Sequence, residues 1–384
     1  MPLATPQGTL DFKSVDTITF VGASSNTVID TTTGSFGVGV DGNGPTSNLH
    51  VVGDALITGN VAVTGTGSLT VPSGTTAQKP TGVTGMIRFN TTVGKLEFYN
   101  GTLWSFIGGV SGTGGTITNV GGYTIHTFTG TSASETFTLI SGGVVEYLVV
   151  AGGGSGSIGR NDYYVPGGGG GAGGMLTGTL DVNAGSYTIT RGAGGASVPY
   201  NGSGTEGNPG TDSTFHTSTA IGGGRGRLNT TTSNGDGGSG GGSGGGGVNT
   251  APAKDGGSGT LNQGNDGGRS DPYTSNGSNN NAGGGGGGAG GSGSDATTAT
   301  GGAGGNGFNS SISGSSTTYA GGGGGSGNTL GSGGSGGGGS GTNNNSNAIS
   351  GTPNTGGGGG GGRGGGGGAS GAGGSGIVII RYLS

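Results

Sequence analysis

The chain has 384 residues, of which 114 are glycine, 26% are apolar and 8% are charged, and its formal net charge is −5. So few Leu, Ile, Val and Phe residues cannot bury a large conventional core, and so small a charge does not hold the chain open by repulsion. The composition therefore excludes most ordinary globular folds and leaves two alternatives open, a disordered glycine-rich tract and a fold held by backbone hydrogen bonds.

Several functional classes are also excluded by composition. The chain contains no cysteine, which excludes disulfides and thiolate metal sites. Its first residues lack the charged and apolar regions of a secretory signal peptide, and no apolar run is long enough to span a membrane. Lys and Arg are few and scattered, which argues against nucleic acid as a partner. We therefore expect no membrane insertion, and an extracellular role would require assembly on a particle in the cytoplasm followed by lysis.

The distribution of glycine divides the chain. Residues 1–110 contain 18 glycines and residues 111–384 contain 96. Together with the local patterns described below, this predicts four regions. They are an N-terminal attachment region (1–46), a hexad-repeat β stalk (47–85), a β-meander (86–110) and a glycine-rich head with a β-sandwich base (111–384).

The first region contains one clear strand candidate, Ser14–Gly22, and the second contains a six-residue period over residues 47–76. Apolar residues recur at the fifth position of successive blocks, in Val51, Ile57, Val63 and Leu69. Such hexads are typical of stacked short strands. One chain cannot bury so narrow an apolar stripe alone, and the pattern therefore predicts a homotrimeric shaft.

Residues 86–107 predict a three-stranded meander with strands Met86–Asn90, Lys95–Tyr99 and Thr102–Ile107. Asn100-Gly101 is the signal for a type I′ hairpin turn. We expect one small aromatic core here, formed by Ile87, Phe89, Leu96, Phe98, Trp104 and Phe106. Core packing is a commoner use of the single Trp than ligand binding.

Strong strand patterns frame the head at Tyr123–Phe128, Glu135–Ile140, Val144–Val150, Ser186–Thr190 and Ile377–Tyr382. The last of these, at the C-terminal end, is the natural partner of Val144–Val150. If the two strands pair, the long glycine-rich tract between them is a closed excursion from a β-sandwich base. This pairing is the main argument against a disordered tail.

Long runs of consecutive glycine favour polyglycine II within the excursion. This conformation has about three residues per turn and about 3.1 Å rise per residue, and its N–H and C=O groups point outward to neighbouring helices. We count about twelve runs in the sequence. The predicted fold class is therefore all-β plus polyglycine-II: a narrow β-repeat stalk, a small β-meander and a β-sandwich base framing a bundle of about twelve polyglycine-II helices.

Alternating run directions place one set of loops at the far end of this bundle, where most aromatic residues are expected. Tyr, Ser, Gly and Asn are typical of adaptable binding loops. The candidate binding residues are Tyr163, Tyr164, Tyr200, Phe215, His216, Tyr273, Phe308 and Tyr319. The alternative is that these aromatic side chains fold back and cap the edge of the bundle.

The segments GGYTIHTFTGT, VVEYLVVAGGGSG and GGSGIVIIRY, within residues 120–156 and 370–382, resemble the ends of a glycine-rich domain common in bacteriophage and environmental viral proteins. NLHVVGDALITGNVAVTG and GMIRFNTTVGKLEFYNGTLWSFIGG resemble tail-fibre modules. Similar polyglycine-II domains form the receptor-binding tips of some phage long tail fibres. The resemblance implies a virion fibre that recognises a host surface.

Catalytic and metal-binding patterns are weak in this sequence. The three histidines lie far apart, no phosphate-binding GxxxxGK[ST] motif occurs, and the matches to GxGxxG are expected by chance at this glycine content. We therefore expect no enzymatic activity, no cofactor and no metal site.

The sequence predicts a virion fibre or adhesin subunit, assembled in the host cytoplasm and exposed on the particle. Its expected partners are itself as a homotrimer, another virion structural protein through the N-terminal region, and a host surface glycan or outer-surface protein. The alternative is a purely structural fibre or decoration protein whose glycine-rich region mediates subunit assembly. A third interpretation, an ice-binding protein, fits the long irregular loops and the stalk less well.

Overall fold

A computed structural model describes residues 27–30, 35–38, 60, 66 and 68–383, apart from 93, 103, 131–133, 161–164, 229–234, 243–252, 272–280, 344–345 and 366–367. These residues form β-strands and one short 3₁₀ helix, η1 (Thr76–Gln78), and contain no α-helix, which confirms the all-β prediction in its general form. The chain divides into two compact units, Met1–Thr70 and Val71–Ser384.

The first unit contains an antiparallel hairpin of β1 (Thr27–Asp30) and β2 (Ser35–Val38). The expected strand Ser14–Gly22 and nearly all of the hexads before residue 68 lie outside the described residues.

The second unit begins with a four-stranded sheet in the order β3-β4-β5-β6. Its strands are β3 (Ser73–Gly74), β4 (Ile87–Asn90), β5 (Lys95–Tyr99) and β6 (Trp104–Phe106). The three predicted strands of the meander are therefore confirmed, and β3 adds a parallel partner to β4. Gly101, in the turn between β5 and β6, has a φ of +101°, a conformation that glycine adopts without a steric penalty.

The prediction of a single aromatic core in this sheet is wrong. Trp104 lies opposite Tyr99 and Phe106 lies opposite Glu97. Because side chains alternate between faces along a strand, both rings lie on the face that carries Glu97. Ile87, Phe89, Leu96 and Phe98 lie on the other face. The register set by the turn thus divides the six residues between two faces.

Two five-stranded sheets form what we call the base. One has the order β15-β14-β13-β10-β7 and the other has the order β12-β11-β18-β9-β8. The strands are β7 (Ser111–Thr113), β8 (Thr116–Val120), β9 (Tyr123–Phe128), β10 (Ser134–Ser141), β11 (Gly143–Val150), β12 (Met175–Val182), β13 (Gly185–Thr190), β14 (Ser213–Phe215), β15 (Ser218–Ala220) and β18 (Ile377–Leu383). All five strands predicted to frame the head are present.

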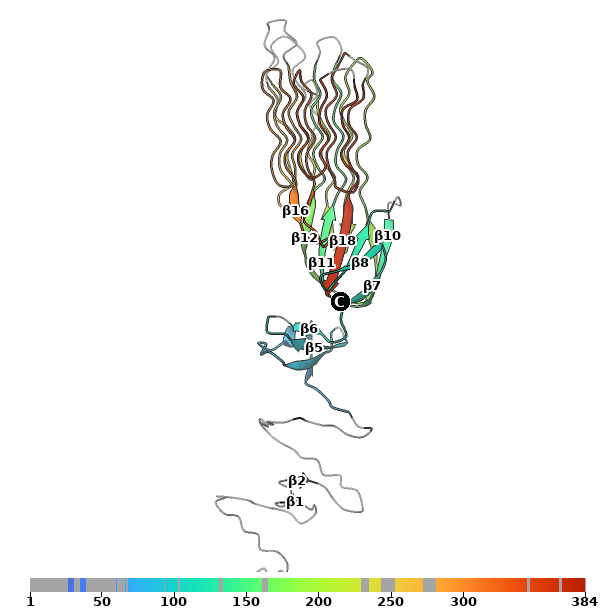
Figure 1. Ribbon diagram of the computed structural model, residues 1–384, viewed down its shortest axis with the longest axis vertical. Helices are drawn as coiled ribbons and strands as arrows, with labels where there is room; N and C mark the ends of the chain where they lie inside the picture. The colour runs from blue at the N-terminus through green and yellow to red at the C-terminus, as the bar shows by residue number, and fades with distance from the viewer. Residues whose placement is uncertain are drawn as a thin grey trace, which may run out of the picture. The chain divides into compact units, whose positions relative to one another are not determined.

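The C-terminal strand closes the glycine-rich excursion. β18 runs antiparallel to β11 with Val150 opposite Ile377, and its other edge pairs with β9. Figure 1 shows these strands side by side at one end of the glycine-rich segments. The predicted pairing of Val144–Val150 with Ile377–Tyr382 is therefore confirmed.

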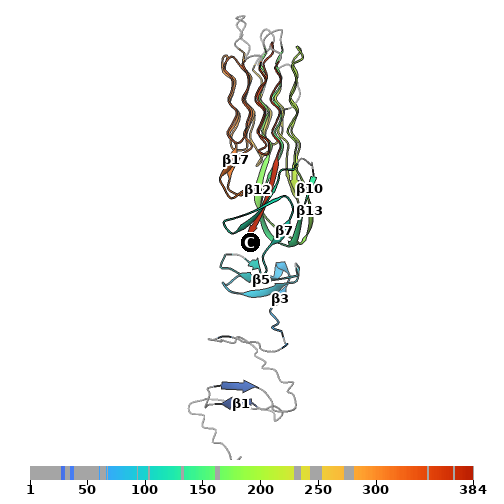
Figure 2. The ribbon, with the colours of Figure 1, turned by 45° about the vertical axis from the view of Figure 1, so that its right-hand side comes forward.

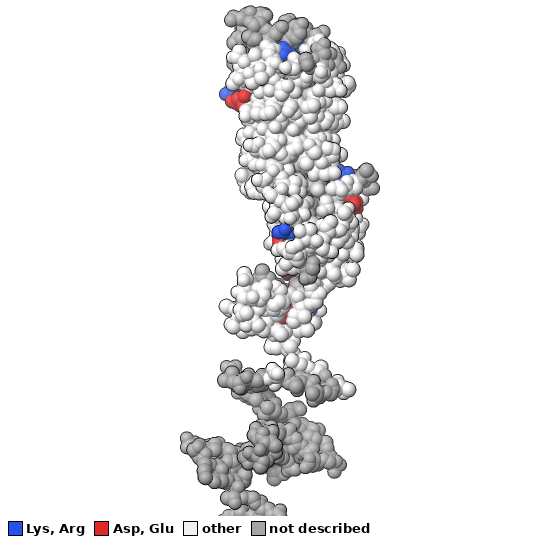
Figure 3. Space-filling model, viewed as in Figure 1, with Lys and Arg blue, Asp and Glu red and all other residues white. Residues whose placement is uncertain are grey.

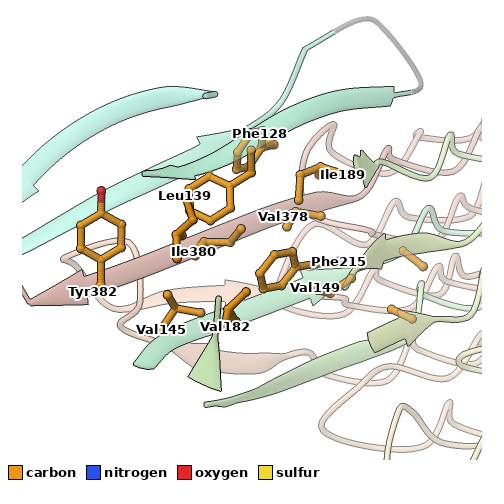
Figure 4. Packing of buried hydrophobic residues seen from close by; sticks show 13 residues of the cluster. Phe128, Leu139, Val145, Val149, Val182, Ile189, Phe215, Val378, Ile380 and Tyr382 are labelled. Carbon is orange, nitrogen blue, oxygen red and sulfur yellow. The ribbon is translucent and has the colours of Figure 1, made fainter. Parts of the chain in front are cut away.

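A hydrophobic core fills the space between the two sheets of the base. Phe137 and Phe215 come from one sheet and Phe128 comes from the other, and all three are fully buried. Figure 4 shows Phe128 and Phe215 in this core. The ring of Phe137 meets those of Phe128 and Phe215 edge-on, with centroids 6.1 Å apart in both pairs. Burying a side chain of this size contributes about 1.5–3 kcal/mol.

Extended glycine-rich segments occupy most of the chain between β11 and β18, and we call them together the glycine array. They comprise residues 151–160, 165–174, 191–212, 221–228, 235–242, 253–271, 281–307, 320–343, 346–365 and 368–376. They contain few regular β-strand pairs, yet they are densely joined by backbone hydrogen bonds. Figure 2 shows the segments running beside one another away from the base.

These hydrogen bonds repeat every third residue. Along residues 151–158, the amides of 151, 154 and 157 bond to segment 168–174, those of 152, 155 and 158 to segment 205–211, and those of 153 and 156 to segment 371–374. The carbonyls of the same stretch accept from Gly195 and from segments 223–226 and 359–362. This segment therefore bonds to six others: all eight of its amides donate, and the carbonyls of 152–155, 157 and 158 accept.

Such close approach of backbones explains why these positions are glycine. A Cβ at Gly170 would lie 2.1 Å from the carbonyl oxygen of Gly154, far inside van der Waals contact. The neighbour is backbone that is itself hydrogen-bonded, so it cannot move aside without breaking further bonds.

We expect Gly170→Ala to lower the free energy of unfolding by at least about 2 kcal/mol, because the added methyl overpacks a rigid site. Gly291→Ala is the matched control, since its nearest heavy atom would lie 3.9 Å away. The control should change stability by less than about 1 kcal/mol. Thermal and denaturant unfolding measure both, and equal losses in the two variants would contradict this account of the packing.

His126 is a buried polar group that ties the last strand to the rest of the base. Its Nδ1 lies 2.8 Å from the carbonyl oxygen of Gly114, and its Nε2 lies 2.9 Å from the hydroxyl of Tyr382. Because a carbonyl only accepts, the neutral ring donates from Nδ1 and accepts the Tyr382 hydroxyl proton at Nε2. Burial lowers the pKa of His126, partly offset by the hydrogen bond to Gly114.

This lowered pKa predicts that stability falls as the pH drops through about 6.5, the ordinary value for histidine. Below that pH the unfolded chain binds a proton that the folded chain binds less well, so unfolding is favoured. Denaturant unfolding at pH 7 and pH 5 should show a less stable protein at pH 5. His126→Gln should have a weaker pH dependence over this interval, and an unchanged dependence would assign the effect to other groups.

Candidate functional site

The structure describes five of the eight candidate binding residues. Tyr163, Tyr164 and Tyr273 lie outside the described residues. Tyr200 lies in an outer turn of the glycine array, as the sequence predicted. The other four, Phe215, His216, Phe308 and Tyr319, belong to strands or a turn at the base end, and their expected place in distal loops is wrong.

The prediction placed Phe215 and His216 at the wrong end because the segment 196–221 is long enough to run out from the base and back. Residues 205–211 return antiparallel to 151–158, and the chain then forms the hairpin of β14 and β15. Phe215 is fully buried in the core of the base. His216 is exposed in the hairpin turn with φ +52°, beside Tyr187 at a ring distance of 5.4 Å.

Phe308 and Tyr319 pair with each other in the hairpin of β16 (Phe308–Ser310) and β17 (Thr317–Tyr319). Tyr319 is 4% exposed and packs in a second hydrophobic cluster with residues such as Leu148 and Ile379 of the base. Phe308 is half exposed and lines an open cavity of about 380 Å³ with Met175 and Leu176. The short strand-forming runs Phe-Asn-Ser and Thr-Thr-Tyr were the signal that these residues form a hairpin.

We call the end of the glycine array opposite the base the outer end. The chain reverses there at residues 199–204, 297–300 and 327–330. Tyr200 is partly buried in the first of these turns, and its hydroxyl is shielded from solvent without a hydrogen-bond partner. This ring is the one described aromatic side chain of the predicted set that lies at the outer end.

Charged side chains also gather toward the outer end. Figure 3 shows a side surface of the array that is free of charge over much of its length, with charged atoms near the outer end and at the base. The basic residues of this group are Arg160, Arg225, Arg227, Lys254, Arg269 and Arg363, and the acidic ones are Glu206, Asp255, Asp271 and Asp295. Basic groups therefore outnumber acidic ones among the described residues here, although the whole chain carries −5.

The arginines of this group bind both carboxylates and backbone carbonyls. Arg225 Nε lies 3.5 Å from Glu206 Oε2, and Arg269 Nε lies 2.8 Å from Asp255 Oδ1 in an exposed pair. Arg227 Nη1 donates to the carbonyl of Asp255 at 3.0 Å. Because exposed ion pairs contribute little to stability, the charges are available for other partners at small cost.

Two further groups extend this arrangement. Arg363 Nη1 donates to the carbonyls of Gly327 and Asn343, at 3.1 and 3.3 Å, and so spans two outer turns. Asp271 is largely buried beside the array, and burial raises the pKa of its carboxyl. Planar guanidinium groups held in this way suit the recognition of carboxylates and phosphates.

Sequence reasoning missed this cluster because it treated the basic residues as scattered. The signal was their position: Arg160, Arg225, Arg227, Arg269 and Arg363 each follow a glycine directly. Each of these arginines lies on a segment that runs away from the base, near its outer end. Arg191, which instead precedes a glycine segment, lies at the base and donates to the carbonyl of Gly130.

Within the described part of the chain, no group of three or more His, Asp or Glu side chains is placed to hold a metal ion. The same residues contain no helix of the length and hydrophobicity needed to cross a membrane.

A comparison with protein families finds that a family described as a glycine-rich domain matches residues 126–383, about two thirds of the chain. No curated protein matches the chain. The matched residues begin in β9 and end in β18, the two strands that pair at the base. The predicted resemblance of both ends to a glycine-rich domain is therefore confirmed.

We expect Phe215→Ala and Tyr200→Ala to differ sharply in stability. Truncating the fully buried Phe215 should cost about 3–5 kcal/mol, because it leaves a cavity between the sheets of the base. Tyr200→Ala should cost much less, since its ring lies in an outer turn. Denaturant unfolding monitored by circular dichroism measures both, and an equal or larger loss for Tyr200→Ala would argue that Tyr200 is a structural cap.

Proposed function

We propose a role in surface recognition for this chain, which belongs to the glycine-rich domain family over residues 126–383. In this proposal it is a virion fibre or adhesin subunit, without enzymatic activity, that binds a host-cell surface through the outer end of the glycine array. The likeness of residues 48–65 and 85–109 to tail-fibre modules supports the virion part of the proposal.

The observation that carries the proposal is the distribution of side chains along the array. Its interior consists of glycine and small residues whose backbones are fully occupied with one another. Arginine and acidic side chains gather instead toward the outer end, together with Tyr200. Binding residues displayed by a rigid scaffold are a common arrangement for recognition.

We further infer that the array is a polyglycine-II bundle. The three-residue period of the hydrogen bonds and the six neighbours of residues 151–158 support this conformation, which has three residues per turn. Such a bundle is stiff, because each segment is bonded on every side, and stiffness lowers the entropy that the outer turns lose on binding.

The proposed ligand is a host surface glycan or outer-surface protein with anionic groups. Arginines bind carboxylate and phosphate groups with two parallel hydrogen bonds, and a tyrosine ring packs against the apolar face of a sugar. Among the described residues of the outer end, basic groups outnumber acidic ones on an acidic chain, which favours a negatively charged target.

The remaining parts of the proposal concern assembly and location. Residues 47–85 form a homotrimeric stalk, the region 1–46 attaches to another virion structural protein, and the particle is assembled in the host cytoplasm. The apolar stripe of the hexads supports the stalk, since a single chain cannot bury it.

Binding of the full chain to an array of bacterial surface polysaccharides and to whole bacterial cells tests this function. We expect Arg227→Ala and Tyr200→Ala to weaken binding at least tenfold, with a stronger effect of salt on the wild type than on the arginine variant. Arg191→Ala is the matched control, since it removes the same side chain and a similar bond to a carbonyl at the base end.

Equal losses in Arg227→Ala and Arg191→Ala would contradict recognition at the outer end. A chain that forms open polymers whose contacts protect the outer end, with no binding to any surface, would favour the structural alternative. In that case the glycine array serves subunit assembly.

A further inference from the structure

The four-stranded sheet of β3 to β6 has its polar and apolar faces reversed relative to an ordinary exposed sheet. Arg88, Asn90 and Glu97 are 5%, 0% and 0% exposed. On the opposite face, Ile87 and Leu96 are 47% and 38% exposed. Within one chain, this sheet therefore shields its charges and leaves its apolar residues in water.

Charged side chains of the polar face are paired with one another. Glu97 meets Arg88 at 3.4 Å and Lys79 at 3.1 Å, and it accepts a hydrogen bond from Asn90 at 3.2 Å. Arg88 also donates to the carbonyl of Thr75 at 3.1 Å. A charged network of this kind is costly to bury unless its members are paired, which explains why Glu97 is surrounded by Arg88, Lys79 and Asn90.

The base meets the sheet on the side of the polar face. Lys95, which shares that face with Glu97, donates to the carbonyl of Gly142 at 2.7 Å, and Phe106 packs close to Gly143. The base thus leaves the apolar face open. Its exposed members are Met86 (39%), Ile87 (47%), Phe89 (37%), Leu96 (38%) and Ile107 (47%).

We propose that this apolar face, defined by Ile87, Phe89, Leu96 and Ile107, is a self-association surface that packs against the same sheet of further copies of this chain. Each copy buries the face of its neighbour, and the paired charges of Arg88 and Glu97 remain turned toward their own base. The inference is independent of surface recognition, since it concerns the opposite part of the second unit.

Two observations favour another copy of this chain as the occupant. The face carries no charged side chain, because Arg88, Lys95 and Glu97 all lie on the other face, so identical copies meet without repulsion. The preceding hexads carry an apolar stripe of their own, and its described member Leu69 is 70% exposed. Leu69 and the apolar face of the sheet thus both expose apolar side chains, and a patch of this kind marks an interaction site.

The association state of the full chain tests the proposal. We expect the wild type to be a stable oligomer at nanomolar to micromolar concentration in mass photometry and sedimentation. Ile87→Glu and Leu96→Glu should each weaken association at least tenfold, because a charge would be buried against an apolar neighbour. Leu261→Glu, at a residue that is 85% exposed in a turn of the glycine array, is the matched control and should assemble as the wild type does.

Disulfide cross-linking supplies a second test that does not depend on a destabilising charge. The chain contains no cysteine, so Ile87→Cys introduces a single thiol on the proposed surface. Mild oxidation at micromolar concentration should yield covalent dimers of Ile87→Cys and few of Leu261→Cys. Fluorescence of the single tryptophan, Trp104, reports that the sheet of each variant is folded.

A wild type that remains a single chain at all these concentrations overturns the inference. The inference is also overturned if Val63→Asp, in the hexads, abolishes assembly while Ile87→Glu and Leu96→Glu leave it intact. The hexads alone would then hold the copies together. Equal cross-linking of Ile87→Cys and Leu261→Cys also overturns it. Loss of polysaccharide or cell binding in outer-end variants leaves these results unaffected, so the two proposals fail separately.

Discussion

Backbone hydrogen bonding between glycine-rich segments is the interaction on which the rest of this structure depends. Ordering one residue costs about 1–2 kcal/mol of backbone entropy, whereas one hydrogen bond contributes about 0.5–1.5 kcal/mol net. A single pair of glycine segments would therefore be unstable. Segment 151–158 is bonded to six others, so that every amide donates and most carbonyls accept within the array. The absence of side chains is the condition for this approach.

The base supplies what the glycine array lacks, a conventional side-chain core. Its two sheets bury Phe128, Phe137 and Phe215, and the pairing of β11 with β18 fixes both ends of the glycine-rich tract to one sheet. Because both ends are fixed, the segments must run out and return, and the side chains at the reversals are displayed at the end opposite the base. Hairpins such as β14–β15 and β16–β17 return to the base and add their aromatic residues to it.

The same constraint explains where side-chain chemistry can occur. An interior of interlocked backbones has no room for arginine or tyrosine, so such residues are confined to the ends of segments and to turns. Among the described residues, the outer end thereby concentrates cationic groups on a chain with few charges. At the other end of this unit, the sheet of β3 to β6 buries its charges and exposes its apolar residues, an arrangement that fits contact with further copies.

The sequence by itself determined the composition-driven features of this protein. Glycine content excluded an ordinary core, the turn signal at Asn100-Gly101 marked the meander, and the runs Val144–Val150 and Ile377–Tyr382 identified each other as partners, because continuous apolar strands require burial on both faces. Only the tertiary structure decided the direction and length of each glycine segment, since consecutive glycines carry no pattern that distinguishes outgoing from returning backbone. That is why Phe215, His216, Phe308 and Tyr319 were assigned to the wrong end, and why the arginine cluster was missed. Which face of the β3–β6 sheet is buried was likewise decided by tertiary contacts. Alternation along a strand specifies only which residues share a face. The packing of Arg88 and Glu97 against their neighbours specifies which of the two faces is buried.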